Sequence, residues 1–329
     1  MMFLYILLLI LSFLGVLIYR RIAIRSNIID IPNERSSHTV PTPRGAGVAV
    51  SAIWFITIIY LFLIEKKIPS NLFYALSGGL LLSLIGIIDD IWSISPKVRL
   101  IVQIIASSIA LFALGGLPKI DLGFYCIESF WLLTPIAFVM IIWFINLFNF
   151  LDGIDGYLGV ETLFIFGFVG FFFSDNTAIC LALIIVGFLF HNWPKAKVFM
   201  GDVGSTLIGY NVAVFALYYQ NSGKTSLIIW LILSSLFWFD ATLTLYRRFR
   251  NKENLMKAHK KHAYQRIVQA GYSHQKTLFY SIGINIIILG LVIMAIIYMK
   301  FSFFLLVLNV LLLYCIDRLI GINKPFPAE

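Results

Sequence analysis

The sequence predicts an all-α polytopic membrane protein with about eleven transmembrane helices. Hydrophobic residues make up 60% of the 329 positions and charged residues 12%, whereas a soluble domain carries roughly 45–50% and about 25%. Apolar runs recur along the whole chain, and their lengths are close to the roughly 20 residues that a helix needs to cross a bilayer. Lys and Arg also fall unevenly on alternate loops. We therefore expect one integral membrane domain over residues 1–329, with no room for a separate soluble domain.

The apolar runs define the expected helices, and those at 157–173 and 177–193 are short. The first run is followed by Arg20 and Arg21 and lacks a small-residue cleavage site, which favours a retained helix over a signal peptide. The three cysteines follow no metal-ligand spacing and predict no disulfide framework. The runs are 2–19, 46–64, 71–88, 100–117, 131–148, 157–173, 177–193, 204–220, 225–246, 277–299 and 301–320.

The distribution of Lys and Arg predicts the orientation. Of the 25 such residues, five fall on one set of alternate loops: Lys66, Lys67, Lys119, Lys224 and Lys300. The other 20 fall on the loops at 20–45, 89–99, 149–156, 194–203 and 247–276 and near the C-terminus. The positive-inside rule makes this second set cytoplasmic, with the N-terminus outside and the C-terminus inside. Topology thus explains the net charge of +9, and no nucleic-acid partner is expected.

Acidic residues gather on the same predicted face. Asp89 and Asp90 end the third run, Asp152 and Asp155 follow the fifth, and Asp202 precedes the eighth. Acidic side chains at membrane depth are costly and mark functional sites by default. Any single Asp here has an alternative role as a helix cap, but three clusters on one face predict a site. The opposite face carries only Glu65, Asp121, Glu128 and Asp175, which are neither paired nor set in Gly-rich sequence.

Carboxylates among many cations indicate a divalent metal with an anionic substrate. Mg²⁺ binds through one or two carboxylates while substrate phosphates complete its shell, and like charges packed without a cation would raise each other's pKa. The glycines in DGIDGYLG and MGDVGS allow tight turns and close approach of a ligand. The helix expected to begin at Asp202 offers free N–H groups to a phosphate, although an ordinary N-cap turn is the alternative. Because no Walker A or G-x-G-x-x-G sequence is present, a nucleotide-hydrolysing or Rossmann enzyme is not supported.

The longest basic loop, 246–276, contains His259 and His262 at i, i+3 and Arg266 one turn on. If the segment is helical, these three side chains share one face and suit a diphosphate. A surface helix bound to anionic lipid headgroups is the alternative. His191 and His274 belong to no such pattern.

The first basic loop, DIPNERSSHTVPTPRGAG at 30–47, is rich in Pro, Ser and Gly and is predicted to be ordered and non-helical. Its candidate phosphate donors are Arg35, Ser36, Ser37, His38 and Arg44. A linker whose arginines only set the topology is equally compatible with its composition.

Four sequence blocks together resemble the polyprenyl-phosphate N-acetylhexosamine-1-phosphate transferases. They are PNERSSHTVPTPRGAG, DDIWSISPKVRL, NLFNFLDGIDG with FMGDVGS, and AHKKHAYQR, and they span residues 32–266. The last block is most similar to the branch that initiates O-antigen-type glycans. The resemblance implies transfer of a sugar 1-phosphate from a UDP-N-acetylhexosamine, or a 6-deoxy relative, to undecaprenyl phosphate with release of UMP. It also implies dependence on Mg²⁺, with Mn²⁺ as a substitute, at the cytoplasmic face of the bacterial inner membrane.

The resemblance also implies roles for individual residues. Asp202, with Asn149, would bind the metal. Asp89 and Asp90 would bind or deprotonate the polyprenyl phosphate, which then attacks the β-phosphorus, and Asp152 and Asp155 would hold the uridine or the basic residues of the site. A single displacement is preferred, while a path through an aspartyl intermediate stays open. The residues expected to bind substrate are Asn146, Asn149, Arg35, Arg44, His259, His262 and Arg266.

Other classes of protein remain as alternatives. An ion-coupled secondary transporter also uses carboxylates in the membrane, but it needs them near the middle of helices and a repeat relating its halves. A UDP-MurNAc-pentapeptide phosphotransferase, a polyprenyl-diphosphate phosphatase and a structural scaffold are the others. The bilayer is an expected partner and a homodimer is left open. The sequence does not distinguish the donor sugar, nor lipopolysaccharide from other envelope polysaccharides as the product.

Overall fold

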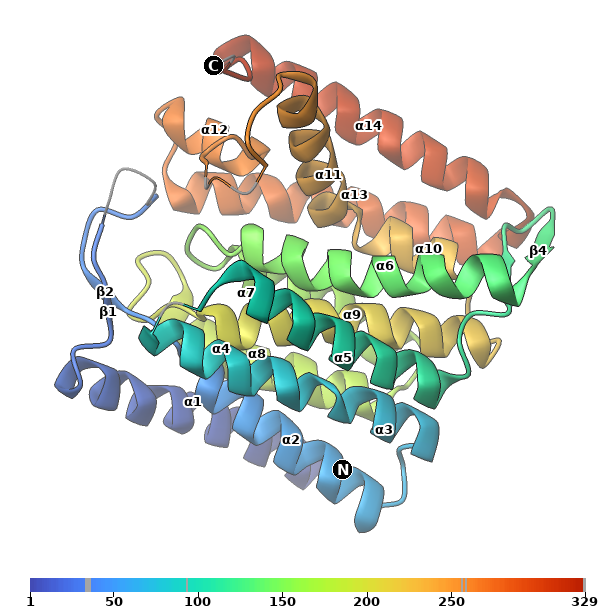
Figure 1. Cartoon of the computed structure of the whole chain (residues 1–329), viewed down its shortest axis with the longest axis horizontal. Coiled ribbons are helices and arrows are strands. Elements are labelled where there is room, and N and C mark those ends of the chain that lie inside the picture. The colour runs from blue at the N-terminus through green and yellow to red at the C-terminus, as the bar shows by residue number, and fades with distance from the viewer. Residues whose placement is uncertain (33–36, 93, 256, 258, 328–329) are drawn as a thin grey trace.

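The structure is a computed structural model that describes residues 1–329 except 33–36, 93, 256, 258 and 328–329. Its helices lie roughly side by side in one bundle (Figure 1). The helices are α1 (Met2–Arg25), α2 (Gly47–Leu63), α3 (Ser70–Ser77), α4 (Gly79–Trp92), α5 (Pro96–Leu114), α6 (Phe130–Phe150), α7 (Tyr157–Phe172), α8 (Asn176–Asn192), α9 (Asp202–Asn221), α10 (Leu227–Leu233), α11 (Ser235–Arg250), α12 (Ala263–Gln269), α13 (His274–Ile297) and α14 (Ser302–Asn323), with a short 3₁₀ turn η1 (Met299–Phe301) before the last.

Each of the eleven predicted apolar runs is helical. Among the described residues, six helices or helix pairs are long and apolar enough to cross a membrane, and a seventh is added if α10 and α11 form one span. The helices α2, α7 and α8 are apolar but shorter. The chain is therefore a polytopic helical membrane protein, and the count of about eleven crossings stays a prediction.

Two of the predicted spans are interrupted. The run at 71–88 is divided at Gly78 into α3 and α4, which still qualify together as one span, Ser70–Trp92. The run at 225–246 is divided at Ser234, where α10 and α11 meet at 79°. The bend turns α11 away from the axis that α10 follows, and Figure 1 shows α11 rising toward α12 and α14. Hydrophobic periodicity alone contains no signal for this change of direction.

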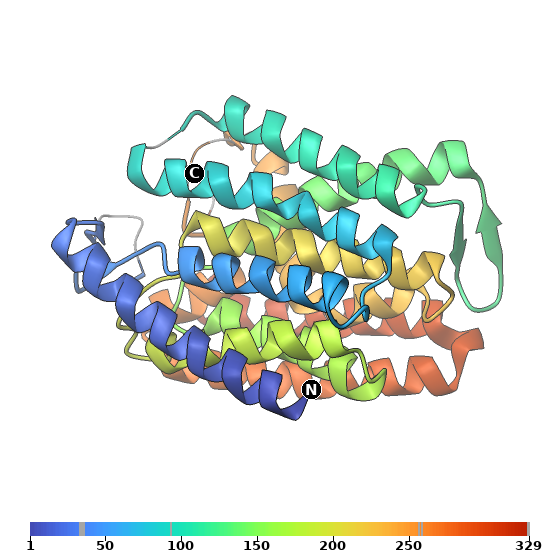
Figure 2. The same ribbon diagram turned by 90° about the horizontal axis from the view of Figure 1, so that it is seen from below.

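The all-α prediction missed two short hairpins at opposite ends of the bundle (Figure 2). Strands β1 (Ile29–Asp30) and β2 (Thr42–Pro43) pair antiparallel in the first basic loop, which confirms the expected ordered, non-helical segment in its described part. Strands β3 (Lys119–Asp121) and β4 (Cys126–Glu128) pair antiparallel at the other end. The two ends of the bundle thus differ, and one of them is formed by β1–β2 and the loops beside it.

Helix α9 forms the centre of the bundle. It packs against α2, α4 and α6, and nearly all of its side chains after Asp202 are buried. A helix that is apolar on every side belongs inside a protein, so α9 acts as the support around which the other helices are placed. A buried carboxylate, Glu161 in α7, accepts a 2.8 Å hydrogen bond from Asn285 in α13 and joins two helices.

The contact between α9 and α6 depends on a glycine. A methyl group at Gly209 would collide with the Phe144 carbonyl oxygen and lie 2.9 Å from the Phe148 Cβ, whereas a methyl group at Gly283 in α13 would meet nothing within 4 Å. The substitution G209A should destabilise the fold by about 1–3 kcal/mol through overpacking. The control G283A should be neutral or stabilising by roughly 0.5–1 kcal/mol. Thermal unfolding in detergent measures both, and equal melting temperatures for the two variants would contradict this packing.

Candidate active site

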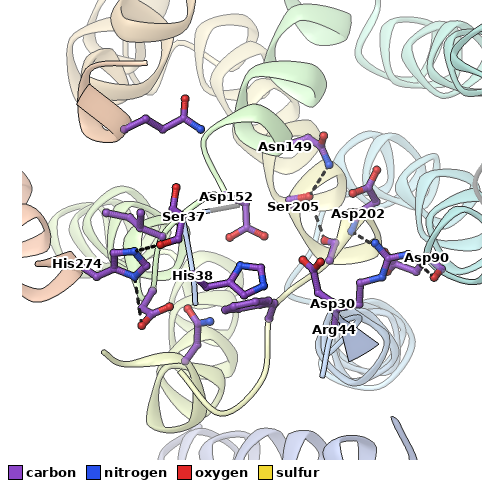
Figure 3. Close-up of a pocket in the computed structure, with 17 residues that line it drawn as sticks. Asp30, Ser37, His38, Arg44, Asp90, Asn149, Asp152, Asp202, Ser205 and His274 are labelled. Atoms are coloured by element: carbon purple, nitrogen blue, oxygen red, sulfur yellow. Dashed lines mark hydrogen bonds and ion pairs between the residues drawn. The ribbon is translucent and has the colours of Figure 1, made fainter. Parts of the chain in front are cut away.

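A cavity of about 360 Å³ opens among the loops at the β1–β2 end of the bundle (Figure 3). It is formed by segments far apart in the sequence: the β1–β2 loop, the end of α4, the α6–α7 and α8–α9 loops, and the starts of α9 and α13. Its lining is dominated by polar side chains. The lining residues are Asp30, Ser37, His38, Arg44, Asp90, Asn149, Asp152, Gly153, Ile154, Asp155, Asn192, Phe199, Gly201, Asp202, Ser205, Gln265 and His274.

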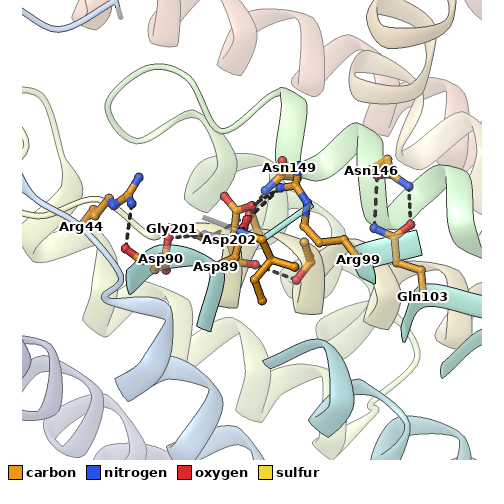
Figure 4. Close-up of polar contacts among 12 residues, drawn as sticks. Arg44, Asp89, Asp90, Arg99, Gln103, Asn146, Asn149, Gly201 and Asp202 are labelled. Atoms are coloured by element: carbon orange, nitrogen blue, oxygen red, sulfur yellow. Dashed lines mark hydrogen bonds and ion pairs between the residues drawn. The ribbon is translucent and has the colours of Figure 1, made fainter. Parts of the chain in front are cut away.

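The two carboxylates at the end of α4 have different surroundings (Figure 4). Asp89 is occupied at both oxygens, because Oδ1 accepts from the Ile94 N–H at 2.5 Å and Oδ2 accepts from Arg99 Nη1 at 2.8 Å. Asp90 is 7% exposed and its Oδ1 accepts a long hydrogen bond, 3.4 Å, from the Asp202 N–H. Its buried Oδ2 has no hydrogen-bond partner among the described residues. Of the pair, Asp90 thus has the oxygen that remains available to a ligand.

Asp202 reaches this pair because α9 begins there. Gly201, just before the helix, has a φ of +76°, a value that glycine adopts without strain. A side chain at this position would also lie 2.6 Å from Asp90 Oδ2. The glycine therefore provides the tight turn that the MGDVGS motif predicted and also allows the close approach to Asp90, while the predicted approach of a ligand stays a prediction. Arg99 Nη1 lies 3.0 Å from Asp202 Oδ2 and links Asp202 to Asp89.

Asn149 and Asp152 complete the carboxylate cluster. Asn149 Nδ2 donates to Ser205 Oγ at 3.0 Å, which leaves the amide oxygen for another ligand. Within the described chain, the Asp152 carboxylate accepts no hydrogen bond, and it points into the cavity in Figure 3. Burial raises the pKa of Asp152 to about 8, with added repulsion from Asp202 and Asp90. Such a cluster is more stable with a cation beside it.

These residues fit a divalent cation of the Mg²⁺ type. Across the described residues, no three His, Cys, Asp or Glu side chains are arranged as a complete metal site. Mg²⁺ does not need one, since it keeps waters and takes one or two carboxylates with substrate phosphates. The unpartnered Asp90 oxygen, the Asp152 carboxylate and the Asn149 amide oxygen are hard donors of that kind.

Asp155 is joined to the other side of the cavity. Its Oδ2 accepts from the Ala196 N–H at 3.1 Å and lies 3.4 Å from His274 Nδ1. His274 Nε2 lies 3.0 Å from the Ser37 carbonyl oxygen. Asp155 thus contacts a histidine that in turn contacts the β1–β2 loop, and both of its predicted roles stay predictions.

Arg44 contacts the Asp89–Asp90 end of α4 from the β1–β2 loop. Its Nη2 donates to the Asp90 carbonyl oxygen at 2.7 Å, and the Tyr19 hydroxyl donates to the Arg44 carbonyl oxygen at 3.1 Å. Arg44 also lines the cavity, so the predicted phosphate contact remains open to it. Of the other candidates in this loop, Arg35 and Ser36 lie outside the described residues, whereas Ser37 and His38 line the cavity.

A second opening, a groove of about 470 Å³, adjoins the cavity. It runs between α5, α6 and α11 and shares Asn149, Asp202 and Gln265 with the cavity. Its walls are mixed, with apolar side chains along the helices and basic ones near the 251–262 loop. The lining residues are Pro96, Arg99, Leu100, Gln103, Trp143, Asn146, Asn149, Phe150, Asp202, Thr206, Ala241, Thr244, Leu245, Arg248, Leu255, Lys257, His259, His262 and Gln265.

Asn146 lies in this groove but is already paired. Its Nδ2 donates to Gln103 Oε1 at 2.8 Å, and Gln103 Nε2 donates back to Asn146 Oδ1 at 3.3 Å. The paired amides join α6 to α5 at the groove wall (Figure 4). Substrate binding by Asn146 stays a prediction.

His259 and His262 lie together at the groove, but not on one helix. The expected helical face through His259, His262 and Arg266 is wrong, because α12 begins only at Ala263. The two imidazole rings are nevertheless 4.9 Å apart. Burial, with repulsion from His262 and Arg248, lowers the pKa of His259 to about 3. His259 Nδ1 accepts from the Lys261 N–H at 3.3 Å, so the neutral ring has its proton on Nε2 and is a donor there.

Arg266 is not brought to the cavity or to the groove. It is 2% exposed and its guanidinium forms an ion pair with Asp317 in α14. Arg247 of α11 donates to the same carboxylate at 2.5 and 3.1 Å. The three residues join α11, α12 and α14, so the geometry gives Arg266 a structural contact in place of the predicted diphosphate contact.

The 251–262 loop is shaped by a second buried arginine. Arg248 Nε donates to Glu253 Oε2 at 3.0 Å, and its other nitrogens donate to the carbonyl oxygens of Asn254, Leu255 and Lys257. Glu253 also accepts from Lys261 Nζ at 2.8 Å. These contacts hold the loop in an irregular path that places His259 and His262 at the groove.

Several residues of the site were not predicted from the sequence. Asp30, Asn192 and Gln265 line the cavity, but each stands alone in its segment, without a repeated spacing. His274 was assigned to no pattern, and Arg99 was considered only as a topological cation. The only available signal was position, since all five lie at helix ends or loops on the basic face.

Fold and site together define a multi-pass membrane protein with a carboxylate-lined cavity and an adjoining groove at the helix ends. Known proteins with similar sequences are consistent with a membrane enzyme. A family model described as glycosyl transferase family 4 matches residues 72–220. A Bacillus subtilis (strain 168) protein named probable undecaprenyl-phosphate N-acetylglucosaminyl 1-phosphate transferase is 28% identical over 288 residues, which cover 81% of this chain and 77% of its own length.

Two further relatives bear the name undecaprenyl-phosphate alpha-N-acetylglucosaminyl 1-phosphate transferase. The one from Yersinia pestis is 32% identical over 278 residues, which cover 78% of this chain and 74% of its own length. The one from Escherichia coli (strain K12) is 31% identical, with 78% and 73% covered. The chain belongs to the polyprenyl-phosphate N-acetylhexosamine-1-phosphate transferase superfamily, and it is an enzyme of the phosphotransferase type.

The pKa of Asp152 predicts how cation binding depends on pH. Below about pH 8 its carboxyl is mostly protonated, and a bound cation favours the ionised form. The affinity of the metal-free protein for Mn²⁺ should therefore rise with pH, by up to about tenfold per unit below pH 8, and level off above it. The variant D152N should lose this part of the dependence. Titration of Mn²⁺ followed by electron paramagnetic resonance measures it, and equal slopes for the two proteins would refute the assignment.

Proposed function

We propose that this enzyme transfers N-acetylglucosamine 1-phosphate from UDP-N-acetylglucosamine to undecaprenyl phosphate, giving undecaprenyl-diphosphate-N-acetylglucosamine and UMP. The observation that carries the proposal is that a polar cavity and a partly apolar groove meet at Asn149 and Asp202. The names of the relatives support the choice of sugar and acceptor.

The polar cavity suits the nucleotide sugar. A UDP-sugar carries uracil amides, ribose and sugar hydroxyls and a diphosphate, which need hydrogen-bond partners on all sides. The cavity offers carboxylates, amides and imidazoles for these groups, and Phe199, in edge contact with His38 at 4.9 Å, offers an aromatic surface for a base. The predicted uridine contact of Asp152 or Asp155 fits this placement.

The groove suits the lipid acceptor. Leu100, Trp143, Phe150 and Leu245 line it with apolar surface along helices of the membrane domain. Its other end reaches Asp202 and the histidine pair. A polyprenyl phosphate lying here would keep its chain against apolar side chains while its phosphate reached the donor.

The reaction then needs one displacement. An oxygen of the acceptor phosphate forms a bond to the donor β-phosphorus, and the bond from that phosphorus to the bridging oxygen breaks, so that UMP leaves with the bonding electrons. Such a transfer depends mainly on position and on neutralisation of charge. Asp90 is better placed than Asp89 to take a proton from the acceptor or to orient it, because its Oδ2 has no partner in the described structure while Asp89 is bound to Arg99.

A divalent cation would be held by Asp202 and the Asn149 amide oxygen, with the Asp152 carboxylate of the same cavity as a further oxygen donor. When bound, Mg²⁺ or Mn²⁺ supplies positive charge for the donor diphosphate. His259, which donates from Nε2, and His262 would bind phosphate oxygens from the groove side.

The active end is proposed to face the cytoplasm of a bacterial inner membrane. The 20-to-5 division of Lys and Arg supports this orientation, and UDP-sugars are made in the cytoplasm. The helices α1, α6, α13 and α14 supply apolar lengths suited to the bilayer.

The first experiment measures UMP release by the purified protein in detergent. Undecaprenyl phosphate, Mg²⁺ and a panel of UDP-N-acetylhexosamines are supplied, with EDTA and D202A as controls. The expected result is metal-dependent release with UDP-N-acetylglucosamine and a loss of about a hundredfold or more in D202A. Release of inorganic phosphate instead would indicate a phosphatase. Absence of UMP release with every sugar, from folded protein, would contradict the proposed donor and acceptor.

The orientation is tested with the native cysteines. Cys126 lies in the β3–β4 hairpin and is partly exposed, while Cys180 is buried. A membrane-impermeant maleimide applied to spheroplasts should label wild-type protein and fail to label C126S, because β3–β4 is proposed to face outward. Labelling of Cys126 only after the membrane is opened would reverse the orientation.

A further inference from the structure

A buried carboxylate behind the histidine pair has no place in the reaction described so far. Asp240 lies in α11, beyond the bend at Ser234, and is buried. Its two oxygens accept from the Ala263 N–H at 2.9 and 3.0 Å, and Oδ1 also accepts from the Thr244 hydroxyl at 3.1 Å. Asp240 therefore caps α12 from a neighbouring helix.

The same carboxylate faces His262. Its Oδ1 lies 3.6 Å from His262 Nδ1, a contact that is longer than a hydrogen bond. His262 Nδ1 has no hydrogen-bond partner in the part of the chain that the structure describes, although the ring is buried. On its other sides the ring stacks on Tyr264, with centroids 6.0 Å apart and planes 9° apart, and contacts His259.

We propose that Asp240 is a positioning residue for His262. It attracts the proton on Nδ1, and in the ring that is protonated at both nitrogens the Nε2–H is left to donate to the phosphate oxygens that meet at the groove. A hydrogen bond of this kind is often long without substrate and shortens when substrate binds. The nitrogen that a histidine presents is set by the partner of its other nitrogen. This inference rests on the proposed function, because His262 matters only if phosphate is bound beside it.

A comparison within the chain separates this role from simple support. Asp317 is as buried as Asp240 and is also bound to α11 and α12, through Arg247 and Arg266. Asp317 contacts neither histidine in the described structure. The chain thus has one carboxylate that only joins helices and a second that both caps α12 and faces the His262 ring.

The substitution D240N separates the two contacts of Asp240. The asparagine oxygen can still accept from the Ala263 N–H, so the cap is kept while the charge facing His262 is lost. D240N and H262A should each lower kcat/KM for the UDP-sugar by about ten- to a hundredfold. The double variant should be no worse than H262A, because Asp240 acts through His262. For the control D317N, the loss of kcat/KM and that of H262A should multiply in the double variant. If the losses of kcat/KM from D240N and from H262A also multiply in their double variant, the proposal is overturned.

A second measurement does not depend on activity. Protein labelled with ¹⁵N in histidine should show His262, assigned by its absence in H262A, with a proton on Nδ1. In D240N the ¹⁵N shifts of that ring should change while those of His191 stay the same. Unchanged His262 shifts in D240N contradict the proposal even if UMP release is normal. Changed shifts in a protein that releases no UMP would instead support the contact and count against the proposed function.

Discussion

The approach of α9 to the end of α4 is the contact on which the site depends. Gly201 turns the chain so closely against Asp90 that a single added carbon would lie 2.6 Å from the carboxylate. The turn places the Asp202 N–H toward Asp90 and the Asp202 side chain toward Arg99. Carboxylates that would otherwise repel one another are thereby held together. The Arg99 guanidinium partly offsets the repulsion between the carboxylates. The repulsion that remains favours binding of a cation.

The membrane helices make this arrangement rigid. Because α9 is buried on all sides, its first turn cannot move without moving the helices around it. The Asp90 end of α4 is fixed in addition by Arg44, whose guanidinium binds the Asp90 carbonyl oxygen. By contrast, the groove side depends on an irregular loop held by Arg248 and Glu253. The proposed donor site is thus built on helix ends, and the proposed phosphate contacts of the acceptor side are built on a loop.

The sequence was sufficient for the helices and for the main carboxylates. Long apolar runs predict helices because burial and backbone hydrogen bonding leave few other structures in a membrane. Asp90, Asp152 and Asp202 could be found because charges are costly among apolar residues, so each stood out from its surroundings. Their convergence on one cavity followed from topology, since all three belong to loops on one face.

The remaining features depend on tertiary contacts that no local pattern records. The bend at Ser234 turns α11 and brings Asp240 beside His262, yet nothing in the run 225–246 marks it. Arg266 resembles a substrate ligand in sequence and is instead paired with Asp317, a residue 51 positions away. Gln265 and Asn192 line the cavity as single residues of ordinary type. Such placements follow from packing between helices and could be seen only in three dimensions.

The central claim is that a cation held at Asp202 meets the donor diphosphate in the cavity. Electron–nuclear double resonance on Mn²⁺-loaded protein with UDP-N-acetylglucosamine tests it most directly. We expect a ³¹P coupling to the bound Mn²⁺ that requires the sugar nucleotide and is lost in D202A. A protein that binds both Mn²⁺ and the nucleotide sugar without any ³¹P coupling would contradict it.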